Sequence, residues 1–250
     1  LVAGDFNRDG LQDVATAGLD SDAIGVHIGK GDGTFEDGIA FPLSRSPRRI
    51  VVCDLNGDGR LDLVVSGYGS GYLNILFGIE RGLFEVHRLD LGFSSRVGGI
   101  ISSDLNGDNY IDLVLTSDNN SSIQELYVLL GLGDGVFAPP IRKFLAETSY
   151  PKAIADLNHD EMKDIILVNR QDAFVLYGTQ DGTFTDPIAL QFGDDVAAVQ
   201  IVELSGDQHL DIAYARFHES DVTILTGVGD GAFRAKQSFD VGLNPIEIGV

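Results

Sequence analysis

The stretch Asp54-Leu55-Asn56-Gly57-Asp58-Gly59-Arg60-Leu61-Asp62 decides the fold, because versions of it return along the chain at nearly regular intervals. Related nine-residue segments occupy residues 5–13, 104–112, 156–164 and, in weaker form, 203–211. Their starts at 5, 54, 104, 156 and 203 are 49, 50, 52 and 47 residues apart. A period of this length is typical of proteins built from repeated supersecondary units. We call these segments acidic loops one to five and number their positions one to nine.

A second, glycine-rich signature follows each acidic loop and ends in phenylalanine. It reads Gly-Lys-Gly-Asp-Gly-Thr-Phe at residues 29–35 and returns at 131–137, 178–184 and 227–233. Residues 78–84 keep only its frame, from Gly78 to Phe84, with Glu80-Arg81-Gly82 inside. Asp and Gly are the residues that tight turns favour. We therefore expect these segments to be turns, their aspartates to be turn formers, and the phenylalanines to pack between neighbouring units.

The second repeat shows what one unit forms. Residues 50–53, 61–65, 72–77 and 84–89 are short runs rich in β-branched and aromatic residues, bounded by Gly, Asp and Asn. Four such strands per roughly 50 residues predict an all-β protein, a β-propeller of four-stranded antiparallel blades. A parallel β-helix is the alternative, but its repeats are usually shorter and lack a long acidic hairpin.

The paired signatures resemble the FG-GAP or VCBS repeats of integrin-alpha-like propellers and of many secreted bacterial and fungal proteins. The resemblance covers nearly all 250 residues. It implies a calcium-bearing propeller, commonly of seven blades.

Five repeats fill residues 1–250, which we expect to form a single β-propeller domain. Residues 244–250 align with residues 46–52, the first strand of the second repeat, so they begin a sixth repeat. We therefore expect this chain to be part of a larger, seven-bladed ring, with a closed five-bladed ring as the less favoured alternative. Because the chain begins with Leu1 and not Met, we expect that any targeting peptide has been removed or was never included.

The charge and composition exclude several classes of protein. Seventeen basic and 38 acidic residues give a net charge of −21, which excludes a nucleic-acid binder that works by neutralising phosphates and disfavours anionic membranes. The one cysteine, Cys53, excludes a disulfide framework within the chain. No apolar run approaches the roughly 20 residues of a membrane-spanning helix, so direct membrane insertion is not expected.

The acidic loops have the ligand spacing of a calcium site. Oxygen-bearing side chains stand at positions one, three, five and nine, and by analogy with the EF-hand loop the residue at position seven supplies its carbonyl. Without a cation, carboxylates this close together would repel one another. We predict these ligands: Asp5, Asn7, Asp9, Leu11 and Asp13; Asp54, Asn56, Asp58, Arg60 and Asp62; Asp104, Asn106, Asp108, Tyr110 and Asp112; Asp156, Asn158, Asp160, Met162 and Asp164; and, more weakly, Glu203, Ser205, Asp207 and Asp211.

The turn at position six ranks the loops. Gly10 and Gly59 suit a sharp turn, Asn109 tolerates it, and Glu161 and Gln208 should weaken loops four and five. We expect three to four Ca²⁺ ions; magnesium demands stricter geometry, and no His/Cys cluster in the sequence indicates zinc.

These features favour a calcium-binding, non-catalytic recognition module for cell adhesion, carbohydrate or protein binding. Open calcium loops fill readily where calcium is millimolar, so we expect a secreted or cell-surface location. The carbohydrate or protein ligand is expected at the blade end opposite the acidic loops, where these exposed candidates should lie: Arg48, Arg49, Tyr68, Tyr72, Arg96, Tyr150, Lys152, Arg170, Arg216 and His218.

Two alternatives remain open from the sequence. One is an accessory domain of a larger secreted enzyme. The other is a glycoside-active propeller enzyme, which needs acids outside the repeat pattern; Asp194 and Asp195 are the best such pair.

Overall fold

The computed structural model describes the chain except residues 19–20, 44–45, 68–70, 93–95, 119–123, 146–148, 170–171, 194–195, 247 and 249–250. The predicted sites at Tyr68, Arg170, Asp194 and Asp195 lie outside the described residues. Elsewhere the protein is all-β: the described part contains one short 3₁₀ turn, η1 (Glu80–Gly82), and no α-helix. Accordingly, no helix among these residues is long and apolar enough to cross a membrane.

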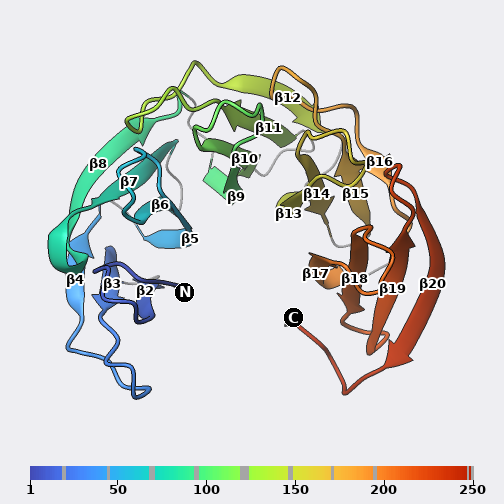
Figure 1. The fold of residues 1–250 in the computed structure, drawn as a ribbon, viewed down its shortest axis with the longest axis horizontal. Helices are drawn as coiled ribbons and strands as arrows, with labels where there is room; N and C mark the ends of the chain where they lie inside the picture. Colours follow the sequence, from blue (N-terminus) through green and yellow to red (C-terminus); the bar gives the residue numbers. More distant parts are fainter. Residues whose placement is uncertain are drawn as a thin grey trace. The chain divides into compact units, whose positions relative to one another are not determined.

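Each repeat forms one four-stranded sheet of consecutive strands (Figure 1). Sheet one contains β1 (Val2–Gly4), β2 (Asp13–Gly18), β3 (Ala23–His27) and β4 (Ile39–Pro42). Sheet two contains β5 (Pro47–Cys53), β6 (Asp62–Gly67), β7 (Tyr72–Gly78) and β8 (Phe84–Asp90). Sheet three contains β9 (Arg96–Ser103), β10 (Asp112–Asp118), β11 (Gln124–Leu129) and β12 (Ile141–Leu145). Sheet four contains β13 (Tyr150–Ala155), β14 (Asp164–Val168), β15 (Ala173–Leu176) and β16 (Ile188–Ala189). Sheet five contains β17 (Val196–Val202), β18 (Asp211–Arg216), β19 (Asp221–Gly227) and β20 (Phe233–Asp240).

The order of strands confirms the predicted blade. In sheet two, β5, β6, β7 and β8 pair in sequence order and antiparallel, and they begin within three residues of the predicted runs. An up-and-down sheet places the β5–β6 and β7–β8 connections at one end. The acidic loop and the glycine-rich turn of each repeat therefore lie at the same end.

The chain divides into two compact units, one of residues 1–102 and 109–144 and the other of residues 103–108 and 145–250. The first holds sheets one to three, apart from the last residues of β9 and β12, and the second holds sheets four and five. Whether residues 1–250 behave as a single domain stays a prediction.

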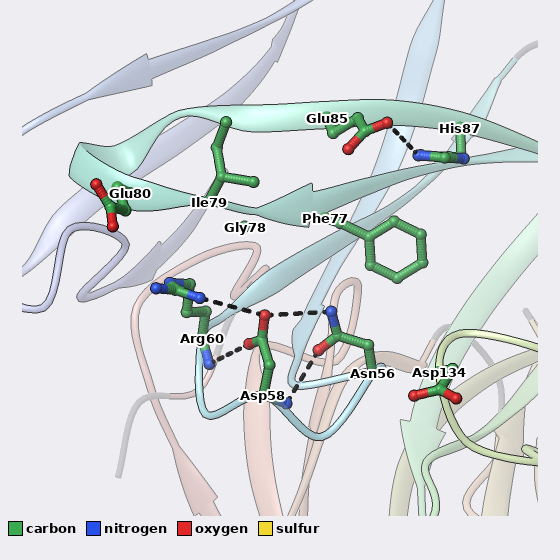
Figure 2. A pocket seen from close by; sticks show the side chains of 10 residues that line it. All are labelled: Asn56, Asp58, Arg60, Phe77, Gly78, Ile79, Glu80, Glu85, His87 and Asp134. Atoms are coloured by element: carbon green, nitrogen blue, oxygen red, sulfur yellow. Dashed lines mark hydrogen bonds and ion pairs between the residues drawn. The ribbon is translucent and has the colours of Figure 1, made fainter.

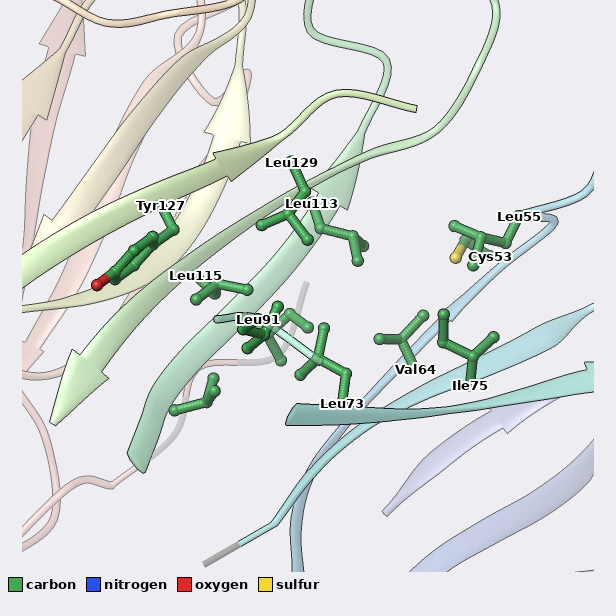
Figure 3. Close-up of a cluster of buried hydrophobic side chains, with 12 residues drawn as sticks. Cys53, Leu55, Val64, Leu73, Ile75, Leu91, Leu113, Leu115, Tyr127 and Leu129 are labelled. Carbon is green, nitrogen blue, oxygen red and sulfur yellow. The ribbon is translucent and has the colours of Figure 1, made fainter. Parts of the chain in front are cut away.

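Within each unit the core lies between neighbouring sheets. In the first unit, Val64, Leu73 and Ile75 of sheet two pack in one cluster with Leu113 and Leu129 of sheet three (Figure 3). A second cluster joins sheets one and two, and in the second unit a third joins sheets four and five. Middle strands are covered on both faces; β6 and β14 are buried along their full length. This explains why they read as continuous apolar runs rather than as alternating patterns.

The phenylalanines that end the glycine-rich turns follow the prediction only in part. Phe84 and Phe184 are buried, and Phe137 and Phe233 pack against the clusters. Phe35 is 43% exposed, so in sheet one the expected packing is not seen among the described residues.

Candidate functional site

The acidic loops connect the first and second strands of each sheet. Position nine is the first residue of the second strand in every repeat: Asp13, Asp62, Asp112, Asp164 and Asp211. Position two is anchored as well, because Phe6, Leu55 and Leu157 are buried in the clusters between sheets. The apolar residue at position two of each loop indicates this anchoring, but Leu204 of loop five is exposed.

The carboxylate at position one organises the loop. In loop two, Oδ1 of Asp54 accepts hydrogen bonds from the backbone N–H groups of Gly57 (2.8 Å) and Asp58 (3.1 Å), and Oδ2 accepts one from Gly59 (2.8 Å). Asp5, Asp104 and Asp156 each accept from their own loop's N–H groups in the same way. The backbone of each of these loops therefore curls around the position-one carboxylate.

Positions three and five continue the same pattern. Oδ1 of Asn56 accepts the N–H of Asp58 (3.1 Å), and Oδ1 of Asp58 accepts the N–H of Arg60 (2.8 Å). Figure 2 shows these three residues together. The position-three amide also donates from Nδ2 to position five in loops one to four, at 2.8, 3.3, 2.9 and 2.9 Å. To present only oxygen atoms to a cation, this amide must release the carboxylate.

The aspartate at position nine joins the loop to the third strand. Asp62 is fully buried, and its Oδ2 accepts the N–H of Leu55 (2.8 Å) while its Oδ1 accepts the N–H of Gly78 (2.7 Å). The same pair of bonds is made by Asp13, Asp164 and Asp211, and Asp112 accepts from Gly131. We call this arrangement the carboxylate clasp.

The clasp explains why the second signature begins with glycine. A Cβ at Gly78 would lie 2.4 Å from the carbonyl oxygen of Leu61, and the equivalent Gly29, Gly131, Gly178 and Gly227 are equally crowded by a backbone oxygen at 2.1 to 2.5 Å. A side chain there would push the third strand away from the carboxylate. Spacing alone did not indicate this role, because the partners are 16 residues apart.

Burial changes the ionisation of the clasp carboxylates. Burial above all, together with the negative charges of Asp160 and Asp156, raises the pKa of Asp164 to about 6, although N–H bonds from Gly178 and Leu157 oppose the shift. The pKa of Asp62 is raised for the same reasons. These carboxyl groups hold a proton more readily in the metal-free fold than in the unfolded chain.

This shift predicts how metal-free stability depends on pH. Between about pH 4, near the pKa of an unfolded Asp, and pH 6, the folded state binds more protons than the unfolded one at Asp164. The contribution of Asp164 to the free energy of unfolding therefore falls as pH rises through this window. Urea titrations in calcium-free buffer should show wild type losing stability relative to Asp164→Asn from pH 4 to 7. A difference that grows in favour of wild type would contradict the assignment.

The turn at position six adopts the left-handed conformation in all five loops. Gly10 and Gly59 have φ of 86° and 79°, and Asn109, Glu161 and Gln208 have φ of 67°, 70° and 71°. The predicted sharp turn is confirmed, and Glu161 and Gln208 adopt it despite carrying long side chains. Position four is left-handed too, a feature not predicted from the sequence. Its residues are Arg8, Gly57, Gly107, His159 and Gly206.

Glu161→Gly is expected to stabilise loop four. The substitution relieves a strained left-handed residue, and after the entropy that glycine adds to the unfolded chain the net gain is about 0.5 to 1 kcal/mol. The bond from the N–H of residue 161 to Asp156 is a backbone bond and survives the change. Urea denaturation checks the gain, with Gly59→Glu in loop two as the reciprocal control; a loss for Glu161→Gly or no loss for Gly59→Glu would refute the strain argument.

The acidic loops contain the right types of ligand atom for a calcium ion, but their side chains do not yet converge on one point. Loops one to four offer carboxylate, amide and carbonyl oxygens, the ligand types that Ca²⁺ takes. Among the described residues, however, no group of three or more His, Cys, Asp or Glu side chains already converges as a metal set. Loop five is further from the pattern: Glu203 replaces the position-one aspartate, and Asp211 receives three backbone N–H bonds.

The aspartates of the glycine-rich turns form turns, as expected. Oδ1 of Asp32 accepts from the N–H and the hydroxyl of Thr34, and these bonds lower its pKa. Asp181 makes the corresponding bonds with Thr179 and Thr183.

A pocket of about 570 Å³ lies beside acidic loop two (Figure 2). Its walls come from loop two, the end of β7, η1, β8 and the glycine-rich turn of sheet three: Asn56, Asp58, Arg60, Phe77, Gly78, Ile79, Glu80, Glu85, His87 and Asp134. Four carboxylates face two basic groups, Arg60 lies 3.5 Å from Asp58, and Glu85 lies 3.1 Å from His87. The pocket is therefore acidic, and its wall carries the phenyl ring of Phe77 beside the imidazole of His87.

At the opposite end of the blades Arg48, Arg49, Lys152 and His218 are exposed, as predicted, whereas Tyr72 and Arg216 are not. Tyr72 is buried and packs under the guanidinium of Arg88, 3.9 Å from the ring centroid. Arg216 pairs with Asp221 through two nitrogen atoms. These two candidates serve the fold rather than an exposed surface.

Comparisons with known proteins agree with the blade architecture. A sequence profile of FG-GAP-like repeats matches residues 5–65 and 156–214. No curated protein is significantly similar in sequence to the chain.

Among solved structures, a Lactobacillus plantarum protein is 18% identical with a TM-score of 0.65, over 94% of this chain and 70% of its own. The periplasmic gluconolactonase of Pseudomonas aeruginosa is 14% identical with a TM-score of 0.64, over 95% and 69%. An Agrocybe aegerita lectin that recognises non-reducing terminal N-acetylglucosamine is 17% identical with a TM-score of 0.51, over 95% and 79%. These likenesses support the β-propeller fold and, at such identities, nothing finer.

Proposed function

From the FG-GAP-like repeats that this chain contains, we propose that it is a calcium-binding recognition module without catalytic activity. The observation that carries the proposal is the loop backbone, whose position-five N–H donates to the position-one carboxylate in each of loops one to four. A loop already held in shape needs only side-chain rotation to receive a cation, so less ordering opposes binding. Filling such open loops requires abundant calcium, which favours a secreted or cell-surface location.

The ligand proposed for this module is a carbohydrate bound in the pocket beside loop two. Carboxylates accept hydrogen bonds from sugar hydroxyl groups, and an aromatic wall packs against the apolar face of a sugar ring. The negative lining disfavours anionic ligands. Calcium in loop two would hold Asn56 and Asp58, two residues of the pocket wall, in place.

A catalytic role fits this pocket less well. A glycoside hydrolase needs a carboxyl group desolvated enough to act as a general acid. Glu80, Glu85 and Asp134 are exposed. We therefore propose binding without turnover.

A glycan array probed in CaCl₂ and in EGTA tests the proposal. We expect calcium-dependent binding that falls at least tenfold in Glu80→Gln and in Glu85→Gln, because each substitution removes a carboxylate from the pocket wall. Neither residue belongs to a predicted calcium set, so the loss would come from the pocket and not from calcium binding. Glu36→Gln, an exposed glutamate of sheet one, is the matched control and should bind as wild type. Binding that is equal in EGTA, or unchanged in both pocket variants, would refute this site; hydrolysis of any bound glycan would refute the non-catalytic assignment.

A further inference from the structure

Two histidines from neighbouring sheets of the second unit meet at the acidic-loop end. His159 belongs to loop four, between β13 and β14, and His209 to loop five, between β17 and β18. Nε2 of His159 lies 3.0 Å from Nδ1 of His209, and the ring centroids are 5.1 Å apart at an interplanar angle of 60°. The sheets that carry them pack through a shared hydrophobic cluster.

Local structure holds both rings in place. His159 occupies the left-handed position four, with φ of 60°. His209 occupies position seven, donates its backbone N–H to Asp207 (2.9 Å), and packs against Gly229, where an added Cβ would come within 2.4 Å of its ring.

The fold repeats this packing with other side chains. The position-seven residues Leu11 and Tyr110 lie against Gly31 and Gly133, the equivalents of Gly229. The fold of the blade therefore fixes where the position-seven side chain packs. Among the five loops, only loop five has a histidine at this position. Loop four alone places an imidazole at position four.

We propose that the imidazoles of His159 and His209 together bind one divalent metal ion, Zn²⁺ or a similar nitrogen-preferring ion. Imidazole nitrogen suits Zn²⁺, Ni²⁺ and Cu²⁺, whereas Ca²⁺ prefers oxygen. Two nitrogens on one tetrahedral Zn²⁺, at 2.0–2.1 Å each, are about 3.3 Å apart. The pair therefore needs to open by only a few tenths of an ångström and to turn so that both nitrogen lone pairs face the ion. The ring that donates the shared hydrogen bond releases that proton to solvent and takes one up on its other ring nitrogen, so both imidazoles bind the metal in the neutral form.

The other coordination positions belong to water in this proposal. Among the described residues no third His, Cys, Asp or Glu completes a set with the pair, so the site is weaker than a closed structural zinc site and leaves positions for an outside ligand. The bound ion would bridge sheets four and five, whose acidic loops depart furthest from the calcium pattern. Although both histidines lie in acidic loops, the zinc ligands are imidazole nitrogens, whereas the predicted calcium ligands are oxygen atoms.

Zinc titration of the calcium-saturated chain tests the proposal. Isothermal titration calorimetry with ZnCl₂ should give one site per chain, with affinity at least tenfold lower in His159→Asn and in His209→Asn. His218→Asn, which changes an exposed histidine outside the acidic loops, should bind zinc as wild type does. X-ray absorption at the zinc edge should show two imidazole ligands in wild type.

Three results would overturn the inference: no zinc binding by wild type below millimolar concentrations, equal affinity in both variants, or a zinc spectrum without imidazole. The calcium-dependent melting transition of each variant serves as the check on folding. If His209→Asn unfolds because its ring packs against Gly229, the exposed His159→Asn still decides the outcome.

Discussion

Asp62→Ala is expected to lower the free energy of unfolding of the calcium-free protein by about 4 kcal/mol. The substitution removes the acceptor for the N–H groups of Leu55 and Gly78, both hydrogen-bonded to a fully buried carboxylate. Each buried donor left without a partner costs about 1–3 kcal/mol. Because the loop and the third strand are then no longer joined, the hairpin and its packing loosen together. Urea denaturation in EDTA measures the loss.

Two further variants distinguish the loss of the clasp hydrogen bonds from the loss of a negative charge. Asp58→Ala, in the same loop, removes bonds made at an exposed carboxylate and should cost less than about 1 kcal/mol under the same conditions. Asp62→Asn keeps one acceptor oxygen and should fall between the two. Equal losses for Asp58→Ala and Asp62→Ala would show that the clasp is not the stabilising element.

Calcium is expected to produce the second large effect, a rise in melting temperature. With dissociation constants of 10⁻⁴–10⁻³ M, typical of extracellular modules, 10 mM Ca²⁺ stabilises by about 1.4–2.7 kcal/mol per site. Three filled loops together give about 4–8 kcal/mol, which for a chain of this size corresponds to a shift of at least about 8 °C. Differential scanning calorimetry in EDTA and in CaCl₂ measures it.

Magnesium provides the control for charge screening. The same concentration of MgCl₂ supplies equal ionic charge but demands stricter octahedral geometry, so it should give a much smaller shift. Asp5→Ala combined with Asp54→Ala should remove most of the calcium shift. Identical curves in MgCl₂ and CaCl₂ would mean that general screening of the acidic chain explains the stabilisation.

The sequence was sufficient for the blade because its signals are local and repeated. Turn residues stand at both ends of each apolar run, and the strands predicted in one repeat recur in the next. The buried middle strands β6 and β14 were recognisable as short apolar runs of β-branched residues. The left-handed turn at position six was recognisable from Gly10 and Gly59, and the structure extends it to Glu161 and Gln208.

The clasp and the histidine pair were not readable in the same way. Asp62 has the spacing of a ligand, yet its burial and its bond to Gly78 appear only when the third strand is placed. His159 and His209 stand at different positions of different loops and share no motif; only the packing of sheet four on sheet five brings them together. The left-handed turn at position four was not predicted, although Gly57, Gly107 and Gly206 favour it; Arg8 and His159 adopt it without being residues that predict it.

Direct counting of bound calcium tests the central claim most simply. Equilibrium dialysis of the full chain against 10 mM CaCl₂, with metal quantified by atomic emission, should give three to four Ca²⁺ per chain, falling by one in each of Asp5→Ala, Asp54→Ala and Asp104→Ala. A wild-type value below one, or a value that none of these substitutions lowers, would contradict the account.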